Sequence, residues 1–190
     1  MAVNYQLELE RELQKNEGKT PRLLLHCCCA PCSSYVLEYL SPHFSITAHY
    51  YNPNIDTPEE YAHRARELSR FVQEMPLPGA VDVLAEPYTP AEFYAAVKGL
   101  EDIPEGGRRC YECYRLRLRR AAQAAAAGGY DYFTTTLSIS PHKNAVWLGE
   151  LGEAFAAEYG VRWLPSDFKK KNGFKRSTEL AARYGLYRQD

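Results

Sequence analysis

The chain has 190 residues, of which 45% are hydrophobic and 25% charged, and its formal net charge is -1. A chain of this length can bury one good hydrophobic core, so we expect a single domain over residues 1–190, with a leading helix in residues 1–20. No apolar run approaches the ~20 residues that span a bilayer, and the amino-terminal segment lacks the apolar centre of a signal peptide. Composition therefore argues against a membrane partner and predicts a cytoplasmic protein.

Segments typical of strands and of helices alternate along the chain. Thr57 and Pro58 are typical of a helix start, and Gly128 of a helix end. Apolar and β-rich runs predict strands at 22–26, 44–51, 81–84, 130–137 and 161–168. Helices are expected at 5–16, 32–40, 58–75, 90–98, 110–127, 144–159 and 178–184, with a basic loop at 169–177. This alternation predicts an α/β fold of three layers, α/β/α, with a mostly parallel sheet.

Four of the six cysteines follow the first predicted strand, in the stretch LLLHCCCAPCSS. They are Cys27, Cys28, Cys29 and Cys32. In an open α/β sheet, ligands bind at the carboxyl ends of the strands, where the N–H groups of a helix start also favour thiolates and other anions. We therefore expect a metal or redox centre at this turn.

Cys110 and Cys113 form a second group, in GGRRCYECYRLRLRR, at another predicted junction between a loop and a helix. Four thiolates from two separate loops suit a zinc ion or an iron-sulfur cluster. Cysteines clustered in a reducing compartment are more often metal ligands or redox groups than structural disulfides. The alternative, that all six are small buried hydrophobes, explains their grouping poorly.

Basic residues are concentrated around Cys110 and in FKKKNGFKRS, although the total charge is close to zero. Such a distribution indicates an anionic partner. The alternatives are a solvated face for the lysine run, ordinary strand-end roles for Tyr51 and Asn52, and a turn-capping role for His142.

Five motifs together resemble the QueH-type epoxyqueuosine reductases. In chain order they are HCCCAPCSS, YNPNI followed by EEY and an arginine, CYECYRLRL, TTTLSISPHKN and SDFKKKNGFKRS. The resemblance covers nearly the whole chain from residue 22 onward. It implies a nucleotide-alpha-hydrolase-like (Rossmann-like) fold in a single iron-sulfur domain. The implied activity is the reduction of epoxyqueuosine to queuosine at the wobble position of tRNA.

The resemblance also implies a 4Fe-4S cluster with an additional iron ion beside it. Matched motif to motif, Cys28, Cys29, Cys110 and Cys113 would hold the cluster. Cys32, which ends the CCxPC element, is our candidate for the second iron and for a catalytic role. The cluster would deliver electrons one at a time from an unidentified donor, and the second iron would act on the epoxide as a Lewis acid.

The expected partner is tRNA that bears epoxyqueuosine in its anticodon. Lysine and arginine side chains would hold its phosphates, and Tyr51 would stack on a base. The expected substrate-binding residues are Tyr51, Asn52, Asn54, His142, Lys143, Lys169, Lys170, Lys171, Lys175 and Arg176.

One feature departs from the family pattern. Members commonly continue past a YGLYRQD-like segment into a tail with two further cysteines, whereas this chain stops at Asp190. Any role of those cysteines is therefore expected to be missing here.

Two other functions fit part of the pattern. A cysteine-ligated zinc module that binds nucleic acid would also use four cysteines. A nucleotide-dependent tRNA-modifying enzyme would share the fold, but it should carry a glycine- and serine-rich phosphate loop where cysteines stand here.

Overall fold

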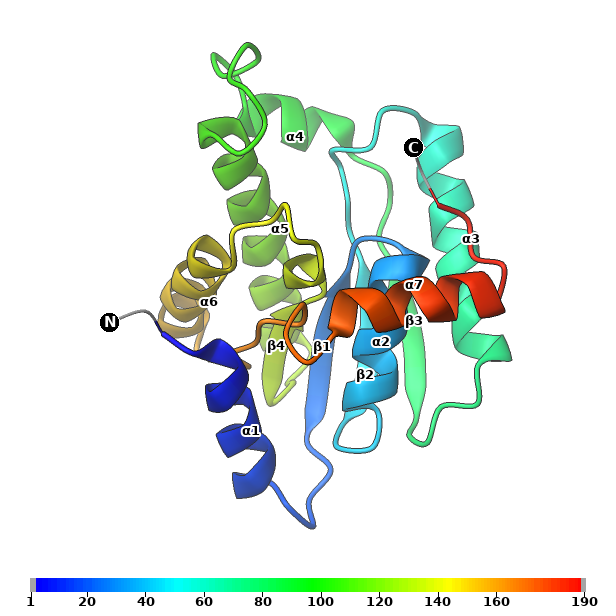
Figure 1. The fold of residues 1–190 in the computed structure, drawn as a ribbon. Helices are drawn as coiled ribbons and strands as arrows, with labels where there is room; N and C mark the ends of the chain where they lie inside the picture. Colours follow the sequence, from blue (N-terminus) through cyan, green and yellow to red (C-terminus); the bar gives the residue numbers. More distant parts are fainter. Residues whose placement is uncertain (1–2, 189–190) are drawn as a thin grey trace.

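The computed structural model describes residues 3–188. Each predicted helix and strand is found there in the predicted order (Figure 1). The elements are α1 (Tyr5–Lys15), β1 (Arg22–Cys27), α2 (Ala30–Leu40), β2 (Ser45–Tyr50), α3 (Pro58–Glu74), β3 (Val81–Ala85), α4 (Pro90–Ala96), α5 (Arg108–Ala127), β4 (Tyr132–Thr135), the 3-10 turn η1 (Leu137–Ile139), α6 (Ala145–Tyr159), β5 (Arg162–Trp163) and α7 (Gly173–Arg183).

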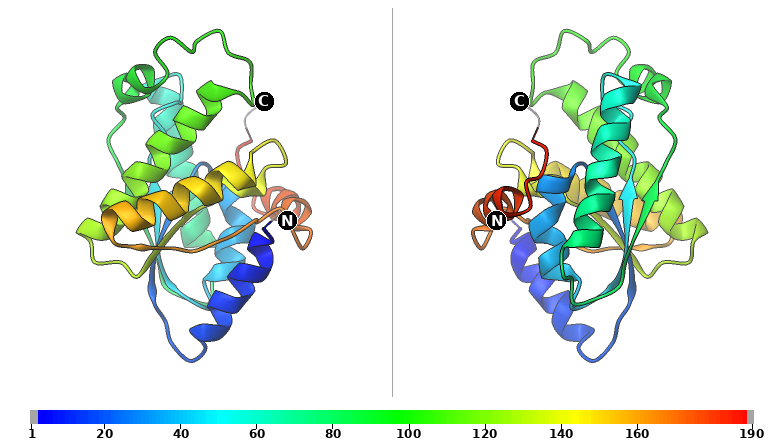
Figure 2. Two further views of the ribbon diagram at one scale, coloured as in Figure 1. Left: turned by 90° about the vertical axis from the view of Figure 1, so that its left-hand side faces the viewer. Right: turned by 90° about the vertical axis from the view of Figure 1, so that its right-hand side faces the viewer.

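The strands form one five-stranded sheet in the order β3-β2-β1-β4-β5. All neighbouring strands pair in parallel. Helices α2 and α3 lie on one face of the sheet, with α7 packed on α2, and α5 and α6 lie on the other face (Figures 1 and 2). The predicted three-layer, Rossmann-like α/β/α fold is thus confirmed.

Strand β1 is buried on both faces of the sheet. Leu23, Leu25 and Cys27 belong to the core under α2 and α3, whereas Leu24 belongs to the core under α5 and α6. This alternation follows from the two-residue period of a strand. Each fully buried leucine contributes about 1.5–3 kcal/mol to folding, so the central strand is firmly held between the two helical layers.

Helices α3 and α6 begin with side-chain caps. Thr57 Oγ1 accepts a hydrogen bond from the Glu60 N–H at 3.1 Å, and Pro58 follows in the first turn of α3. At α6, the Asn144 side chain accepts one from the Trp147 N–H at 3.1 Å. These bonds satisfy amide groups that a helix start leaves without a partner.

The end of the chain differs from the prediction in two places. Helix α7 begins at Gly173 and not at residue 178, so the second half of the predicted basic loop is helical. Asn172 takes a left-handed conformation (φ 59°) before it. A Cβ on Gly173 would lie 1.8 Å from the Phe168 carbonyl oxygen, so the close turn requires glycine there.

Strand β5 is shorter than the predicted run at 161–168. It pairs with β4 only through Arg162 and Trp163. Beyond it, Pro165 has no N–H to offer a ladder, and the Phe168 N–H bonds to Ser138 Oγ at 2.9 Å. No helix among the described residues is long and apolar enough to cross a membrane.

Candidate metal centre

The first cysteine turn lies at the switch point of the sheet. The chain runs from β1 to β2 and β3 on one side and returns to place β4 on the other side of β1. Just past the ends of β1 and β4, the Cys28 N–H donates to Thr136 Oγ1 at 3.4 Å, and the Thr136 N–H donates to the His26 carbonyl at 2.9 Å. A crevice at this point is the usual ligand site of an open parallel sheet.

Three thiols meet in this crevice. The Sγ atoms of Cys28, Cys29 and Cys32 all lie within 4.8 Å of one another, and those of Cys28 and Cys29 are 3.9 Å apart. All three residues are partly exposed and carry free thiols. A tetrahedral metal with ~2.3 Å bonds to sulfur separates its sulfur ligands by about 3.8 Å. The group can therefore hold a metal.

Helix α2 begins inside this group. Cys29 is its N-cap residue, with extended backbone, and Cys32 lies in the first turn, after Pro31. The N–H groups and the dipole of a helix start stabilise a nearby thiolate. The short spacing from Cys28 to Cys32 thus places all three sulfurs where negative charge is favoured.

The three thiols do not share charge equally. Hydrogen bonds from the Cys29 and Cys32 thiols hold the pKa of Cys28 well below its usual value, with the Arg117 charge acting in the same direction. The Cys28 thiolate in turn raises the pKa of Cys29 and Cys32. One thiolate supported by two thiols is an arrangement that a cation would convert into three thiolate ligands.

Cys27 differs from its neighbours although it is adjacent in sequence. It is fully buried under α2, and its thiol donates to the Leu25 carbonyl at 3.4 Å. Burial raises the pKa of Cys27 to about 12. Its sulfur thus points into the core rather than into the crevice, since neighbouring strand residues face opposite sides.

The second cysteine pair lies at the start of α5. Cys110 is in the first turn, where its Sγ accepts a hydrogen bond from the Gly106 N–H at 3.4 Å, and Cys113 is buried one turn later. Both line a cavity of about 230 Å³. Neither belongs to the group of three thiols. Cys28 and Cys110 nevertheless pack against the same core, beneath α5 and α6.

Two of the expected substrate residues, Asn54 and Lys143, line that same cavity. Asn54 has a buried side-chain oxygen without a hydrogen-bond partner among the described residues. The Lys143 ammonium lies 5.8 Å from the centre of the Tyr114 ring. His142 is exposed beside Lys143, and its backbone N–H bonds to Ser140 Oγ at 3.2 Å.

Tyr51 and Asn52 are buried and make structural contacts. Tyr51 is 1% exposed, and its hydroxyl donates to Glu92 at 2.7 Å. Its ring therefore presents no free face to an RNA base in this structure. Asn52 is fully buried, with its amide N–H bonded to the Cys27 carbonyl at 3.0 Å. Neither side chain reaches the surface.

The basic residues of the segment 169–176 fall into two groups. Lys169, Lys171 and Arg176 form ion pairs with Asp167, Glu10 and Glu38 respectively. Lys170 and Lys175 are exposed, and no ion pair to either is found among residues 3–188. These last two lysines are the members of the group with charge most available to a partner.

Two arginines near the thiols were missed by sequence reasoning. Arg64 of α3 lines a cavity of about 230 Å³ with Cys29 and Cys32, and it pairs with Glu60 at 2.8 Å. Arg117 lines the cavity of Cys110 and Cys113 and is 4% exposed. The EEY-and-arginine motif pointed to Arg64, but Arg117 resembled any other member of a basic helix.

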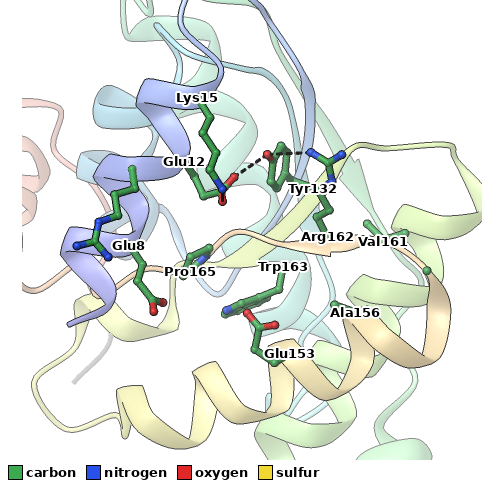
Figure 3. A pocket seen from close by; sticks show the side chains of 12 residues that line it. Glu8, Glu12, Lys15, Tyr132, Glu153, Ala156, Val161, Arg162, Trp163 and Pro165 are labelled. Carbon is green, nitrogen blue, oxygen red and sulfur yellow. Dashed lines mark hydrogen bonds and ion pairs between the residues drawn. The ribbon is translucent and has the colours of Figure 1, made fainter. Parts of the chain in front are cut away.

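A cavity of about 580 Å³ lies elsewhere, between α1, β5 and α6 (Figure 3). No cysteine lines it. Its polar groups bond largely to one another, as in the Tyr132 hydroxyl that donates to Glu12 at 2.8 Å. Tyr132 and Arg162 begin their strands, so this cavity opens at the edge of the sheet opposite the thiols.

Fold and site together define a Rossmann-like α/β protein with a cysteine-lined crevice suited to a metal. The family model described as epoxyqueuosine reductase QueH matches residues 23–190. The chain belongs to this family.

Relatives of that name are similar to the chain over most of its length. The protein of Streptococcus pyogenes serotype M1 is 41% identical over 191 residues, covering 98% of this chain and 75% of its own. That of Staphylococcus epidermidis is 40% identical, with 98% and 81% covered. The Thermotoga maritima protein is 32% identical, with 88% and 85% covered.

Proposed function

We propose that this chain reduces epoxyqueuosine to queuosine in tRNA. The observation that carries the proposal is the meeting of Cys28, Cys29 and Cys32 at the switch point, in a chain of the epoxyqueuosine reductase family. An oxidoreductase needs a centre that accepts and delivers electrons, and clustered thiols are the side chains that hold such centres.

The reaction is a two-electron deoxygenation. Both carbon–oxygen bonds of the epoxide break, a carbon–carbon double bond forms, and the oxygen leaves as water after taking up two protons. These two electrons would reach the epoxide from an electron donor through a bound redox group. When bound, a 4Fe-4S cluster supplies the electrons one at a time, and an adjacent iron supplies a Lewis acid.

The ligand assignment we propose is Cys28, Cys29, Cys110 and Cys113 for the cluster and Cys32 for the second iron. Three observations support a buried anionic centre between the two cysteine groups: the free thiols, the two helix starts that favour thiolates, and the unpaired buried charge of Arg117. Cys32 would have the catalytic role because it would hold the iron that supplies the Lewis acid.

On the substrate side, Asn54 and Lys143 stand closest to the second cysteine pair. We propose that Lys143 and the unpartnered Asn54 oxygen orient the modified nucleoside at the cavity of Cys110 and Cys113. Exposed Lys170 and Lys175 would attract tRNA phosphates, and exposed His142, next to Lys143 in the sequence, would contact the RNA. Lys169, Lys171 and Arg176 would contribute mainly by keeping their segment ordered.

A zinc-binding nucleic-acid module is the second candidate. The observation in its favour is the 3.9 Å separation of the Cys28 and Cys29 sulfurs, which suits one tetrahedral ion. Such a protein would be colourless and would hold zinc without sulfide.

Purification without oxygen, followed by iron, sulfide and zinc analysis and an ultraviolet-visible spectrum, separates the two candidates. The proposed function predicts a brown protein with acid-labile sulfide and iron in excess of four per chain. A protein that holds zinc alone after anaerobic reconstitution with iron and sulfide would rule out the iron-sulfur centre.

A further inference from the structure

Arg117 is a buried cation without an ion pair. It is 4% exposed, and no salt bridge to it is found among residues 3–188. Its Nη1 donates to the Asn52 amide oxygen at 3.2 Å, and its Nε is buried without a partner. A charge in the protein interior is strongly unfavourable unless an opposite charge or a full set of hydrogen bonds surrounds it. An anion therefore belongs beside this guanidinium.

The charges of the other arginines on the same stretch of α5 are balanced by carboxylates or lie nearer the surface. Arg119 pairs with Glu158 at 2.9 Å, and Arg120 pairs with Glu86 at 2.9 Å. The Arg115 side chain is 48% exposed and lies 3.5 Å from the Glu112 carboxylate. Arg117 is thus distinguished on this helix by burial without a carboxylate.

Arg117 is linked to both cysteine groups. It lies one helical turn after Cys113 and lines the same cavity as Cys110 and Cys113. On its other side, Asn52 accepts from Arg117 and donates to the Cys27 carbonyl at 3.0 Å, which ties the guanidinium to the first cysteine turn. Arg117 also acts electrostatically on Cys28.

The anion that best suits the site beside Arg117 is a metal centre held by these thiolates. Thiolate-ligated iron-sulfur clusters carry net negative charge, and that charge helps to set their reduction potential. A tRNA phosphate is the alternative anion. Arg117 has almost no exposed surface, whereas Lys143 and Arg109, which line the same cavity, are more exposed and are the better partners for a phosphate. Cys110 and Cys113 line the same cavity as Arg117, and Asn52 links the guanidinium to the Cys27 carbonyl at the first cysteine turn.

We propose that Arg117 is the counter-charge of the cysteine-bound centre and that its guanidinium raises the reduction potential of that centre. This inference rests on the proposed function. Reduction adds a negative charge to the centre, and a fixed positive charge in a poorly solvated site stabilises the reduced state more than the oxidised one. Arg117 is a positioning residue in this account, since it acts through the centre and does not touch the epoxide.

The test is a redox titration of the purified iron-sulfur protein followed by electron paramagnetic resonance. At the potential where the unaltered cluster is half reduced, Arg117→Gln should lower the ratio of reduced to oxidised cluster about tenfold, which for one electron is ~59 mV. Arg117→Lys keeps a cation and should recover most of the shift. Arg115→Gln removes an exposed charge from the same helix and should leave the ratio unchanged.

Equal midpoint potentials for Arg117→Gln and the unaltered protein would overturn the inference, as would Arg117→Lys behaving like Arg117→Gln. If Arg117→Gln does not fold or hold iron, Asn52→Asp decides: it keeps Arg117 but sets a carboxylate where the amide oxygen now lies 3.2 Å away. That variant should also lower the potential, and an unchanged value would contradict the inference. Absence of an iron-sulfur signal in the unaltered protein would instead refute the proposed function.

Discussion

At the scale of single residues, the side a sulfur faces decides its chemistry. Cys27 and Cys28 are adjacent, but Cys27 is fully buried with its thiol bonded to the Leu25 carbonyl, whereas Cys28 faces the crevice and its hydroxyl neighbour Thr136. The first thiol is held neutral by burial, and the second is favoured as a thiolate. A metal requires thiolates, so the two cysteines should respond differently to the same substitution.

Cys28→Ser should lose most of the bound iron because a serine hydroxyl is a poor ligand for iron that thiolates hold. Cys27→Ser is the matched control: it should keep its iron, since the new hydroxyl can retain the bond to Leu25 in the core. Iron and sulfide analysis after anaerobic reconstitution makes the comparison. Equal iron contents in the two variants would contradict this distinction.

Cys32→Ala separates the two proposed iron sites. With Cys28, Cys29, Cys110 and Cys113 as cluster ligands, the variant should keep the cluster absorbance, lose about one iron per chain and lose epoxide reduction. The alternative is that Cys32 binds the cluster itself, because its Sγ lies within 4.8 Å of those of Cys28 and Cys29, as close as a ligand of the same centre would. Loss of the whole cluster would mean that Cys32 is a ligand of the cluster and not of the second iron.

At the scale of elements, the site lies at helix starts and strand ends, and ion pairs join the helices and strands that carry it. Arg176 of α7 makes two hydrogen bonds to Glu38 of α2, at 2.7 and 3.0 Å. Near the end of β3, Glu86 accepts from Arg120 of α5 and contacts His49 of β2. Basic residues that join elements are therefore structural, and the remaining exposed lysines are the better candidates for RNA.

Lys170→Glu and Lys175→Glu should weaken tRNA binding without changing the metal content. Each lost phosphate contact should reduce the slope of log affinity against log salt by roughly 0.7–0.9. Lys19→Glu, at an exposed site before β1, is the control for a general charge effect. Filter binding across a salt series gives both quantities, and unchanged affinity and slope would mean that the two lysines form a solvated face.

Glu86→Gln should lower the free energy of unfolding by about 2 kcal/mol at neutral pH, because a partly buried, charged hydrogen-bonding partner is lost. Burial opposes ionisation of Glu86, but the hydrogen bonds from His49 and Arg120 outweigh it and lower the pKa of the carboxyl group. The unfolded chain therefore binds the proton more tightly, and the stabilisation is lost as the pH falls through the acid range.

Urea unfolding at a series of pH values measures this dependence. The difference between the unaltered protein and Glu86→Gln should shrink toward acid pH. A difference that stays constant from neutral pH to well below the usual pKa of a glutamate would show that the carboxylate charge has no part in the effect.

At the scale of the whole molecule, the parallel sheet brings two distant cysteine groups toward one edge. The element order and the three-layer fold could be predicted because strand and helix patterns are local and helix starts such as Thr57 are marked in the sequence. The start of α7 could not, since it depends on how closely Gly173 approaches Phe168. The burial of Tyr51 and Asn52 could not be predicted either, because the sequence at a strand end does not show whether a neighbouring helix covers it.

The role of Arg117 could not be predicted from the sequence either. In the sequence it is one of several arginines in RLRLRR, and only the packing of α5 against the first cysteine turn distinguishes it. The meeting of Cys28, Cys29 and Cys32, by contrast, could be predicted, since their short spacing places them together at one helix start.

The most direct test of the account is a single-turnover reaction with tRNA that carries epoxyqueuosine. The protein is reconstituted with iron and sulfide without oxygen, reduced with dithionite, mixed with the tRNA and analysed by mass spectrometry of the released nucleosides. The account predicts queuosine from the unaltered protein and from Cys27→Ser, and unchanged epoxyqueuosine with Cys28→Ser. Queuosine formed equally by Cys28→Ser would contradict it, as would the absence of queuosine with the unaltered protein when its cluster is fully loaded.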